Sequence, residues 1–387
     1  MTFRLPQELV DAILDYLASD FRSLKTCSLV CRSWLPRSRF HLFQTCTLLP
    51  QNILGFSDLL HCPDCTFLRH AHTIKATRYY WHPNDPIFNE VAPSLPRLAN
   101  VRTVEMMLSI KLYLAGARVD AFFRTGFVTA FPQVTRLILT CNFDGTLAPL
   151  VDTICFFSAL EELHINMVFG VLTTPSCSAL PPQMLHYLEL SGDAQGVILA
   201  WLNAFNHLSN VDSLTLRTTV KGPSQREDVR TALQKLGGAI RHLEITVTWL
   251  TGLETIAPSV FDLSLHRNLR TMTIRDCSSP NSRGEFDPSP MIPFIDKLVA
   301  PALECLVLDL DLRFYRTFNW EALDTTLCLT RFPRLRRIVI TDHGRGAHEL
   351  LEAGRCHCPF SLFRECRSRS DTDLDSYPVV VHEFSRL

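Results

Sequence analysis

The residues best suited to chemistry are two cysteines and two histidines in one short stretch. Cys62 and Cys65 are separated by two residues, and His70 and His72 follow them. Thiolates and imidazoles are ligands that zinc prefers, and a Cys-x-x-Cys pair also supports redox chemistry. A second set lies further along the chain: Cys356, His357, Cys358 and Cys366. Because neither set is complete by itself and no thioredoxin-like context follows the first, we predict free thiols, no metal and no cofactor.

Motifs for phosphate binding and nucleophilic catalysis are missing from the sequence. It contains no G-x-x-x-x-G-K-[ST], no G-x-G-x-x-G and no G-x-S-x-G. Carboxylates are spread along the chain without a paired acid–base arrangement. We therefore predict no catalytic residues and a chain that is not an enzyme.

Most of the chain is a repeat of the form L-x-x-L-x-L. The clear copies begin 25–34 residues apart, at Val101, Val134, Leu160, Leu185, Val211, Ile240, Leu269, Leu303 and Leu335. Weaker copies begin at Phe43 and Ala71. The period-2 alternation that ends each copy predicts a short strand. Apolar residues at helical spacing predict helices in the intervals 197–208, 227–236, 293–299 and 320–329.

This repeat resembles that of leucine-rich-repeat proteins. The resemblance implies an α/β fold in which residues 44–354 form an irregular leucine-rich-repeat-like solenoid with a parallel concave sheet. The copies depart from the family's pattern because the regular asparagine after each strand is missing. An ordinary α/β domain with several parallel strands is the alternative.

Polar residues alternate with the apolar ones along the predicted strands and should lie on the sheet's exposed face. Their mixed charge favours a protein or peptide target over a polyanion, and a merely solvated face is the alternative. The candidate substrate-binding residues are Arg136, Glu162, His164, Tyr187, Glu189, Arg217, His242, Glu244, Arg275 and Arg337, and Asp309 occupies a similar position.

An amphipathic helix pair is predicted ahead of the repeat. Pro6 suits the first turn of a helix whose apolar face carries Leu9, Val10, Ile13, Leu14 and Leu17. After a break at Ser19 and Asp20, we expect Ser23 to cap a second helix over 24–35, which Pro36 ends. Two such helices cannot bury all of their apolar surface against each other. Part of it must contact the rest of the chain or another protein.

The same residues resemble an F-box. They read L-P-x-E-L-V-x-x-I-L-x-x-L and L-x-x-C-x-L-V-C-R-x-W, continued by L-P-R-S-R-F-H-L-F, so the resemblance covers residues 1–43. The F-box of this family binds a Skp-type adaptor that leads to a cullin–RING ubiquitin ligase. The resemblance implies adaptor contacts at Leu5, Pro6, Leu9, Ile13, Leu14, Leu17, Leu24, Leu29, Val30 and Trp34.

The resemblance further implies the substrate-recognition subunit of an SCF-type ligase, in which the repeat region binds an unknown target protein. There are two alternatives. The helices are a cap on the following domain, or the chain is a scaffold whose F-box does not deliver substrates.

Composition restricts the expected partners and cellular location of the protein. The chain has 387 residues, of which 47% are hydrophobic, and its formal net charge is −1, which favours neither nucleic acid nor an anionic membrane as partner. It lacks a secretory h-region, an 18-residue apolar run and an N-x-[ST] site, and many of its 14 cysteines fall on apolar positions. We therefore expect a protein of the cytoplasm, the nucleus or both.

Three segments interrupt or follow the repeat. Residues 81–98 and 278–293 are rich in proline and are predicted to be long loops. Residues 355–387 form a C-terminal tail that we expect to be partly disordered or capping. Its apolar piece 379–381 is expected to cover the edge of the last repeat, with disorder as the alternative.

Overall fold

The computed structural model describes residues 5–49, 51–63, 65–78, 91–110, 129–143, 145–146, 148–169, 172–173, 180–218, 223–249, 260–278, 286–315, 317–328, 330–342, 365–371 and 379–385. The chain forms two compact units, Met1–Leu185 and His186–Leu387. This division falls inside the predicted repeat region rather than after residue 43.

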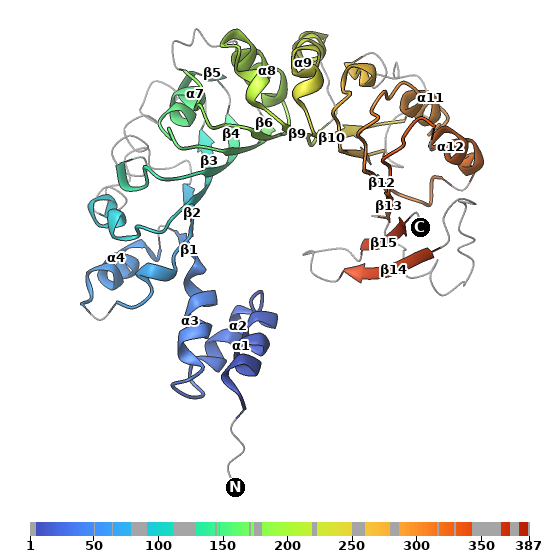
Figure 1. The fold of residues 1–387 in the computed structure, drawn as a ribbon. Helices are drawn as coiled ribbons and strands as arrows, with labels where there is room; N and C mark the ends of the chain where they lie inside the picture. The colour runs from blue at the N-terminus through green and yellow to red at the C-terminus, as the bar shows by residue number, and fades with distance from the viewer. Residues whose placement is uncertain are drawn as a thin grey trace. The chain divides into compact units, whose positions relative to one another are not determined.

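The first unit begins with three helices, α1 (Gln7–Tyr16), α2 (Phe21–Cys27) and α3 (Leu35–Gln44). Both α1 and α2 pack against α3 (Figure 1). The predicted second helix over 24–35 is therefore wrong in its bounds. Pro36 lies in the first turn of α3 instead of ending a helix, since its missing N–H costs nothing there.

Helix α2 also starts earlier than predicted. The carboxylate of Asp20 accepts hydrogen bonds from the backbone N–H groups of Arg22 and Ser23, at 3.1 and 3.0 Å. Asp20, rather than Ser23, is thus the N-cap residue.

The rest of the first unit is a parallel sheet with short helices. Its strands, in both chain and spatial order, are β1 (Thr45–Leu48), β2 (Thr73–Arg78), β3 (Thr103–Ile110), β4 (Arg136–Phe143) and β6 (Glu162–Phe169). The connections contain α4 (Ile53–His61), η1 (Leu68–His70), η2 (Ala92–Arg97) and α7 (Ala148–Cys155). Two short strands, β5 (Gly145–Thr146) and β7 (Leu172–Thr173), pair separately.

The second unit repeats this arrangement. Its parallel strands are β8 (Tyr187–Leu190), β9 (Ser213–Leu216), β10 (His242–Val247), β11 (Thr271–Asp276), β12 (Cys305–Leu310) and β13 (Arg337–Asp342). The connections contain α8 (Ala194–Ala204), η5 (His207–Asn210), α9 (Pro223–Leu236), η6 (Gly237–Ala239), η7 (Leu263–Leu265), α11 (Met291–Asp296) and α12 (Trp320–Thr326). The four α-helices overlap the four predicted helical intervals with different bounds, and they lie on one side of the unit's sheet (Figure 1).

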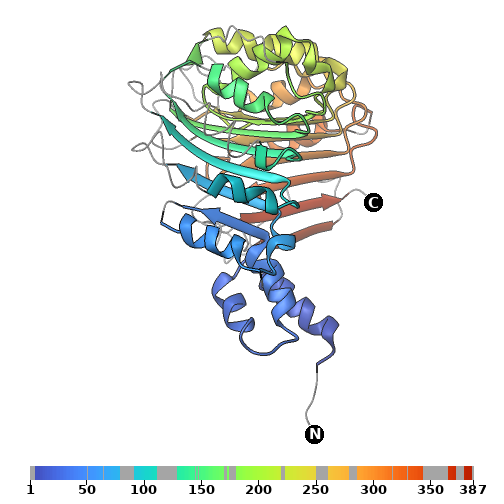
Figure 2. The same cartoon turned by 90° about the vertical axis from the view of Figure 1, so that its left-hand side faces the viewer.

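The repeat sets the strand positions. Every parallel strand except the short pair β5 and β7 begins two residues after the start of a predicted copy, including the two weaker copies at Phe43 and Ala71. The first, fourth and sixth residues of all nine clear copies are buried, for example Leu269, Met272 and Ile274. Neighbouring copies therefore pair position for position, for example His242 with Thr271 and Thr271 with Cys305. Figure 2 shows the strands of each unit lying side by side. The predicted α/β class with a parallel sheet is confirmed.

The predicted loop over 81–98 is wrong in its second half. Residues 92–97 form η2, in which Ser94 and Leu95 are buried and the Arg97 guanidinium donates to the carbonyl of Leu60. Residues 79–90 lie outside the described part of the chain. Of the other predicted loop, residues 279–285 are likewise not described, and residues 291–293 belong to α11.

Two strands of the tail complete the second unit's sheet. Strand β15 (Val379–Ser385) pairs antiparallel with β13, and β14 (Glu365–Asp371) pairs with β15. The piece 379–381 therefore covers the edge of the last repeat, as expected. Residues 355–364 and 372–378 lie outside the described residues.

Candidate functional site

The three N-terminal helices, which we call the N-terminal module (5–44), have a small core of their own. Val10, Leu14 and Leu24 are buried in it. Four half-buried side chains pack against these three: Leu17, Cys27, Trp34 and Leu42. The first helix contributes one narrow stripe to this core, and the remaining apolar side chains of the module point elsewhere.

Those remaining side chains give the module an exposed apolar surface. Leu29 is 86% exposed and Tyr16 is 88% exposed. The other exposed large apolar residues of the module are Leu5, Leu9, Ile13, Phe21 and Val30. Exposed side chains of this size from one small module are typical of a partner-binding surface.

The predicted adaptor contacts divide into three groups by burial. Leu5, Pro6, Leu9, Ile13, Leu29 and Val30 are exposed, and Leu17 and Trp34 are half-buried. The assignment of Leu14 and Leu24 to a partner surface is corrected, because both side chains are 0% exposed in the module's own core. Tyr16 and Phe21 belong to the exposed surface but are not among the predicted contacts. Tyr16 lies seven residues after Leu9 on the same face of α1, so helical spacing could have identified it, whereas Phe21 is the first residue of α2.

An ion-pair cluster joins α1 to α3. The Arg37 guanidinium donates from Nε and Nη2 to the two Asp15 oxygens, at 2.5 and 2.7 Å. His41 Nε2 lies 2.7 Å from Asp15 Oδ1. The hydrogen bonds from Arg37, and then from His41, lower the pKa of Asp15 to about 2. These contacts fix the C-terminal end of α1 against α3.

Polar side chains also pair on the open face of the first unit's sheet. Lys75 Nζ lies 2.7 Å from Glu105 Oε2, across β2 and β3. Arg136 Nε and His164 Nε2 lie 3.3 and 3.5 Å from Glu162 Oε2. The predicted group Arg136, Glu162 and His164 is thus brought together, with His164 largely buried.

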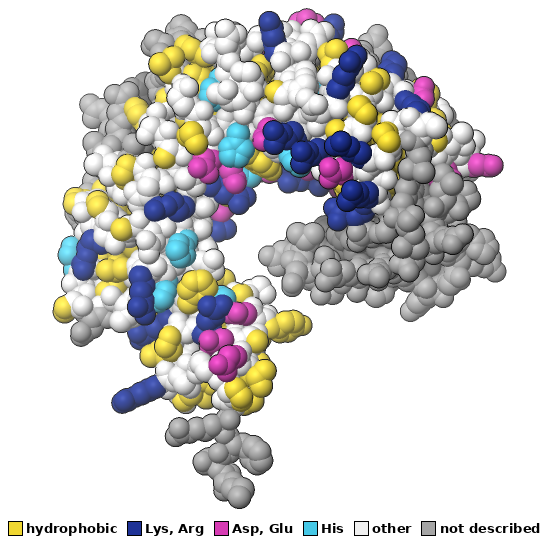
Figure 3. All heavy atoms as spheres, viewed as in Figure 1, with side chains coloured by type: hydrophobic (Ala, Val, Ile, Leu, Met, Phe, Trp, Pro, Cys, Tyr) yellow, Lys and Arg dark blue, Asp and Glu magenta, His cyan; other side chains and the backbone are white. Residues whose placement is uncertain are grey.

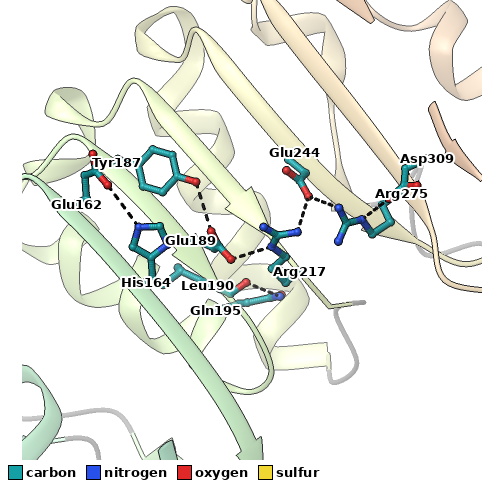
Figure 4. A network of polar contacts seen from close by, with 10 residues as sticks. All are labelled: Glu162, His164, Tyr187, Glu189, Leu190, Gln195, Arg217, Glu244, Arg275 and Asp309. Carbon is teal, nitrogen blue, oxygen red and sulfur yellow. Dashed lines mark hydrogen bonds and ion pairs between the residues drawn. The ribbon is translucent and has the colours of Figure 1, made fainter. Parts of the chain in front are cut away.

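The open face of the second unit carries a longer chain of paired charges, which we call the charge ladder. Its members follow strand order from β8 to β13: Tyr187, Glu189, Arg217, Glu244, Arg275, Asp309 and Thr341 (Figure 4 shows all but the last). Arg217 contacts Glu189 at 2.8 Å and Glu244 at 3.3 Å. Arg275 contacts Glu244 at 3.3 Å and Asp309 at 2.7 Å.

Hydroxyl groups end the ladder on both sides. The Tyr187 hydroxyl donates to Glu189 at 3.4 Å, and the Thr341 hydroxyl donates to Asp309 at 2.7 Å. Burial raises the pKa of the Tyr187 hydroxyl above its usual value, so it stays protonated and able to donate. Each arginine of the ladder lies between two carboxylates. The charged residues predicted to bind a substrate here therefore form ion pairs with one another.

A buried glutamine supports the start of this ladder. Gln195, at the N-terminal end of α8, donates through Nε2 to the carbonyl of Leu190 and to the hydroxyl of Thr218, at 3.3 and 2.8 Å (Figure 4). It ties the helix to the C-terminal end of β8. No pattern in the sequence distinguishes it from an exposed glutamine.

Two predicted face residues do not join the ladder. His242 is exposed at the start of β10 and has no side-chain partner among the described residues. Arg337, at the start of β13, donates from Nε to the thiol of Cys305 at 3.4 Å.

The cysteine and histidine set does not form a metal centre in the described residues. Cys62 and Cys65 are half-buried free thiols, and no group of three or more His, Cys, Asp or Glu side chains there is placed to hold a metal ion. Residues 356–358 of the second set lie outside that part. Among the helices described, none is long and apolar enough to cross a membrane.

Comparison with known proteins gives no family. No protein-family model matches the chain, and a search of curated proteins finds no significant match. The chain is therefore assigned a function only from its own residues.

Proposed function

We propose that this chain is a substrate-recognition subunit of an SCF-type ubiquitin ligase, with a leucine-rich-repeat-like region that binds the target protein. The N-terminal module would bind a Skp-type adaptor as an F-box does. The chain performs no bond chemistry in this role, because it holds a target close to the transferring enzyme.

One observation carries the proposal. Six of the ten side chains to which the F-box resemblance assigns adaptor contacts are exposed: Leu5, Pro6, Leu9, Ile13, Leu29 and Val30. The module's own core is already filled by Val10, Leu14 and Leu24, so these exposed groups are not needed for its packing. Burying each apolar group against a partner would contribute about 1–2 kcal/mol.

The repeat supports the second half of the proposal. Strand and connection alternate at 25–34 residues, and neighbouring strands share register, as in stacked repeat proteins. The open sheet faces carry polar side chains from many strands, which suits binding of a protein surface rather than a small molecule.

The test is co-purification of the full chain with a Skp-type adaptor. A Leu9→Ala/Ile13→Ala/Leu29→Ala variant should lose at least about tenfold in adaptor affinity, since three exposed contacts are truncated. The matched control is Leu54→Ala/Leu59→Ala on α4, whose side chains are 51% and 50% exposed in the same unit. That control should bind as the wild type does.

Two results would redirect the proposal. If the triple variant binds the adaptor normally, the helices are a cap and the F-box resemblance misleads. If the adaptor binds but no bound protein accumulates when the cullin–RING ligase is inhibited, the chain is a scaffold that does not deliver substrates.

A further inference from the structure

The ladder leaves little charge for a partner on the open face of the second unit. Its arginines lie between carboxylates at 2.7–3.3 Å. A charged partner would have to break these contacts before forming its own, which costs desolvation without a clear gain. Unpaired charge in this unit therefore has to be sought elsewhere.

It is found along the edge at which the strands begin. The residues immediately before β10, β11, β12 and β13 are Arg241, Arg270, Glu304 and Arg336. Their backbones are hydrogen-bonded in series, with N···O distances of 2.7, 2.8 and 2.9 Å. Neighbours in this row are thus one strand spacing apart, about 4.8 Å. Arg334 lies two residues before Arg336, in the turn that enters β13.

We call Arg241, Arg270, Arg334 and Arg336 the arginine edge. All four are exposed, and none has an ion pair or a side-chain hydrogen bond within the described residues. Figure 3 shows Lys and Arg side chains gathered over this part of the sheet. Arg102, at the same position before β3, differs because its guanidinium donates to the carbonyls of Ala99 and Val101.

We propose that the arginine edge binds an acidic segment of a partner protein. The guanidinium group matches a carboxylate in geometry, and none of these four forms an ion pair with a carboxylate among the described residues. The row from β10 to β13 spans about 14 Å, which an extended peptide covers with about four residues. A short run of aspartate or glutamate therefore fits it.

Glu304 makes a peptide a better occupant than a nucleic acid. It lies between Arg270 and Arg336 in the row, where a continuous phosphate backbone would place a charge against it. A peptide avoids this repulsion by presenting a neutral or basic residue at that point. The chain's net charge of −1 also provides no general attraction for a polyanion.

The inference that the arginine edge contacts the target of the ligase rests on the proposed function. The inference that it binds an acidic segment does not depend on that function. The two are separated by their variants, because truncations in the N-terminal module should remove the adaptor and leave the arginine edge intact.

The test uses the purified full chain and a fluorescein-labelled decaglutamate peptide, with decaglutamine as the neutral probe. Fluorescence anisotropy should show binding of decaglutamate and no binding of decaglutamine. The Arg241→Gln/Arg270→Gln/Arg336→Gln variant should bind it about tenfold more weakly, since three ion pairs of modest energy are lost. Removing the same charge in the module with Arg22→Gln/Lys25→Gln/Arg32→Gln should leave the affinity unchanged.

A gain-of-affinity variant guards against misfolding as an explanation. Glu304→Gln removes the repulsive group and should tighten decaglutamate binding about threefold. Unchanged binding in the arginine-edge variant, an equal loss in the module variant, or weaker binding by Glu304→Gln would each overturn the proposal. Tighter binding of a decameric oligouridylate than of decaglutamate would also overturn it, in favour of a nucleic acid.

Discussion

At the residue scale, burial separates side chains that the sequence places together. Ile13 and Leu14 are neighbours on the predicted apolar face of α1, yet Ile13 is 43% exposed and Leu14 is 0% exposed. The difference arises because Leu14 lies in the module's core with Val10 and with Leu24 of α2, whereas Ile13 lies outside that core. One residue of each adjacent pair therefore stabilises the module, and the other is available to a partner.

Opposite consequences follow for substitutions at Leu14 and Leu29. Leu14→Ala should lower the free energy of unfolding of the module by about 2–5 kcal/mol, because it leaves a cavity in a small core. Leu29→Ala should change it by less than about 0.5 kcal/mol, because that side chain is 86% exposed. Hydrogen–deuterium exchange of the α1 and α2 amides would measure both, and equal exchange in the two variants would refute the division.

The pKa of Asp15 predicts a pH dependence. Its folded pKa of about 2 lies below the ordinary 3.8, so the contact stabilises the module above pH 4 and is lost as the pH falls towards 2. Asp15 is 43% exposed in its side chain, so screening limits the effect of Asp15→Asn at pH 7 to about 0.5–1 kcal/mol. Urea unfolding should show this difference vanishing as the pH falls below about 2, and an unchanged difference between pH 7 and pH 2 would contradict the role of this contact.

At the element scale, the strands were predictable and the start of each helix was less so. Period-2 spacing located all the parallel strands except the short pair β5 and β7, because every clear copy buries its first, fourth and sixth residues. The sequence did not predict the bounds of α2 and α3, since Pro36 is compatible with either the end or the first turn of a helix. Only the packing of α1 and α2 on α3 decides between them.

The charge ladder shows a second limit of the sequence. Alternation predicted which polar residues lie on the exposed face, but not which of them meet. Arg217 and Glu189 occupy different positions within their copies, and they touch only because a long guanidinium reaches diagonally across β8 and β9. The arginine edge was missed because its residues precede the alternating segment.

Coupling across β11 and β12 measures the strength of the ladder. A double-mutant cycle with Arg275→Met and Asp309→Asn should give an interaction free energy of about 0.5–1.5 kcal/mol, as expected for a partly buried ion pair. The value should fall in 1 M salt because the pair is partly exposed. A cycle between Arg275 and Arg230, which lies on α9 and pairs with Glu227 instead, should give no coupling.

At the scale of the whole molecule, a parallel sheet built from repeats has to end somewhere. Strand β13 is the last copy of the second unit, and an uncovered edge would offer its backbone N–H and C=O groups to another chain. Strand β15 pairs with β13 from Arg337 to Asp342, and β14 pairs with β15 in turn. The edge of the repeat is thus covered by a segment that follows a different, antiparallel geometry.

Removal of this cover should change the association state of the protein. A chain truncated after residue 378 lacks β15, so β13 would expose a row of unpaired backbone groups over six residues. We expect the truncated chain to self-associate in a concentration-dependent way, because edge-to-edge pairing between two copies satisfies those groups. Sedimentation velocity of the full and truncated chains at matched concentrations would detect this association.

The Val339→Lys variant of the truncated chain, central in the exposed edge, should not associate, since charged side chains oppose edge pairing. A truncated chain that stays monomeric over the same range would mean that β15 is dispensable as a cover.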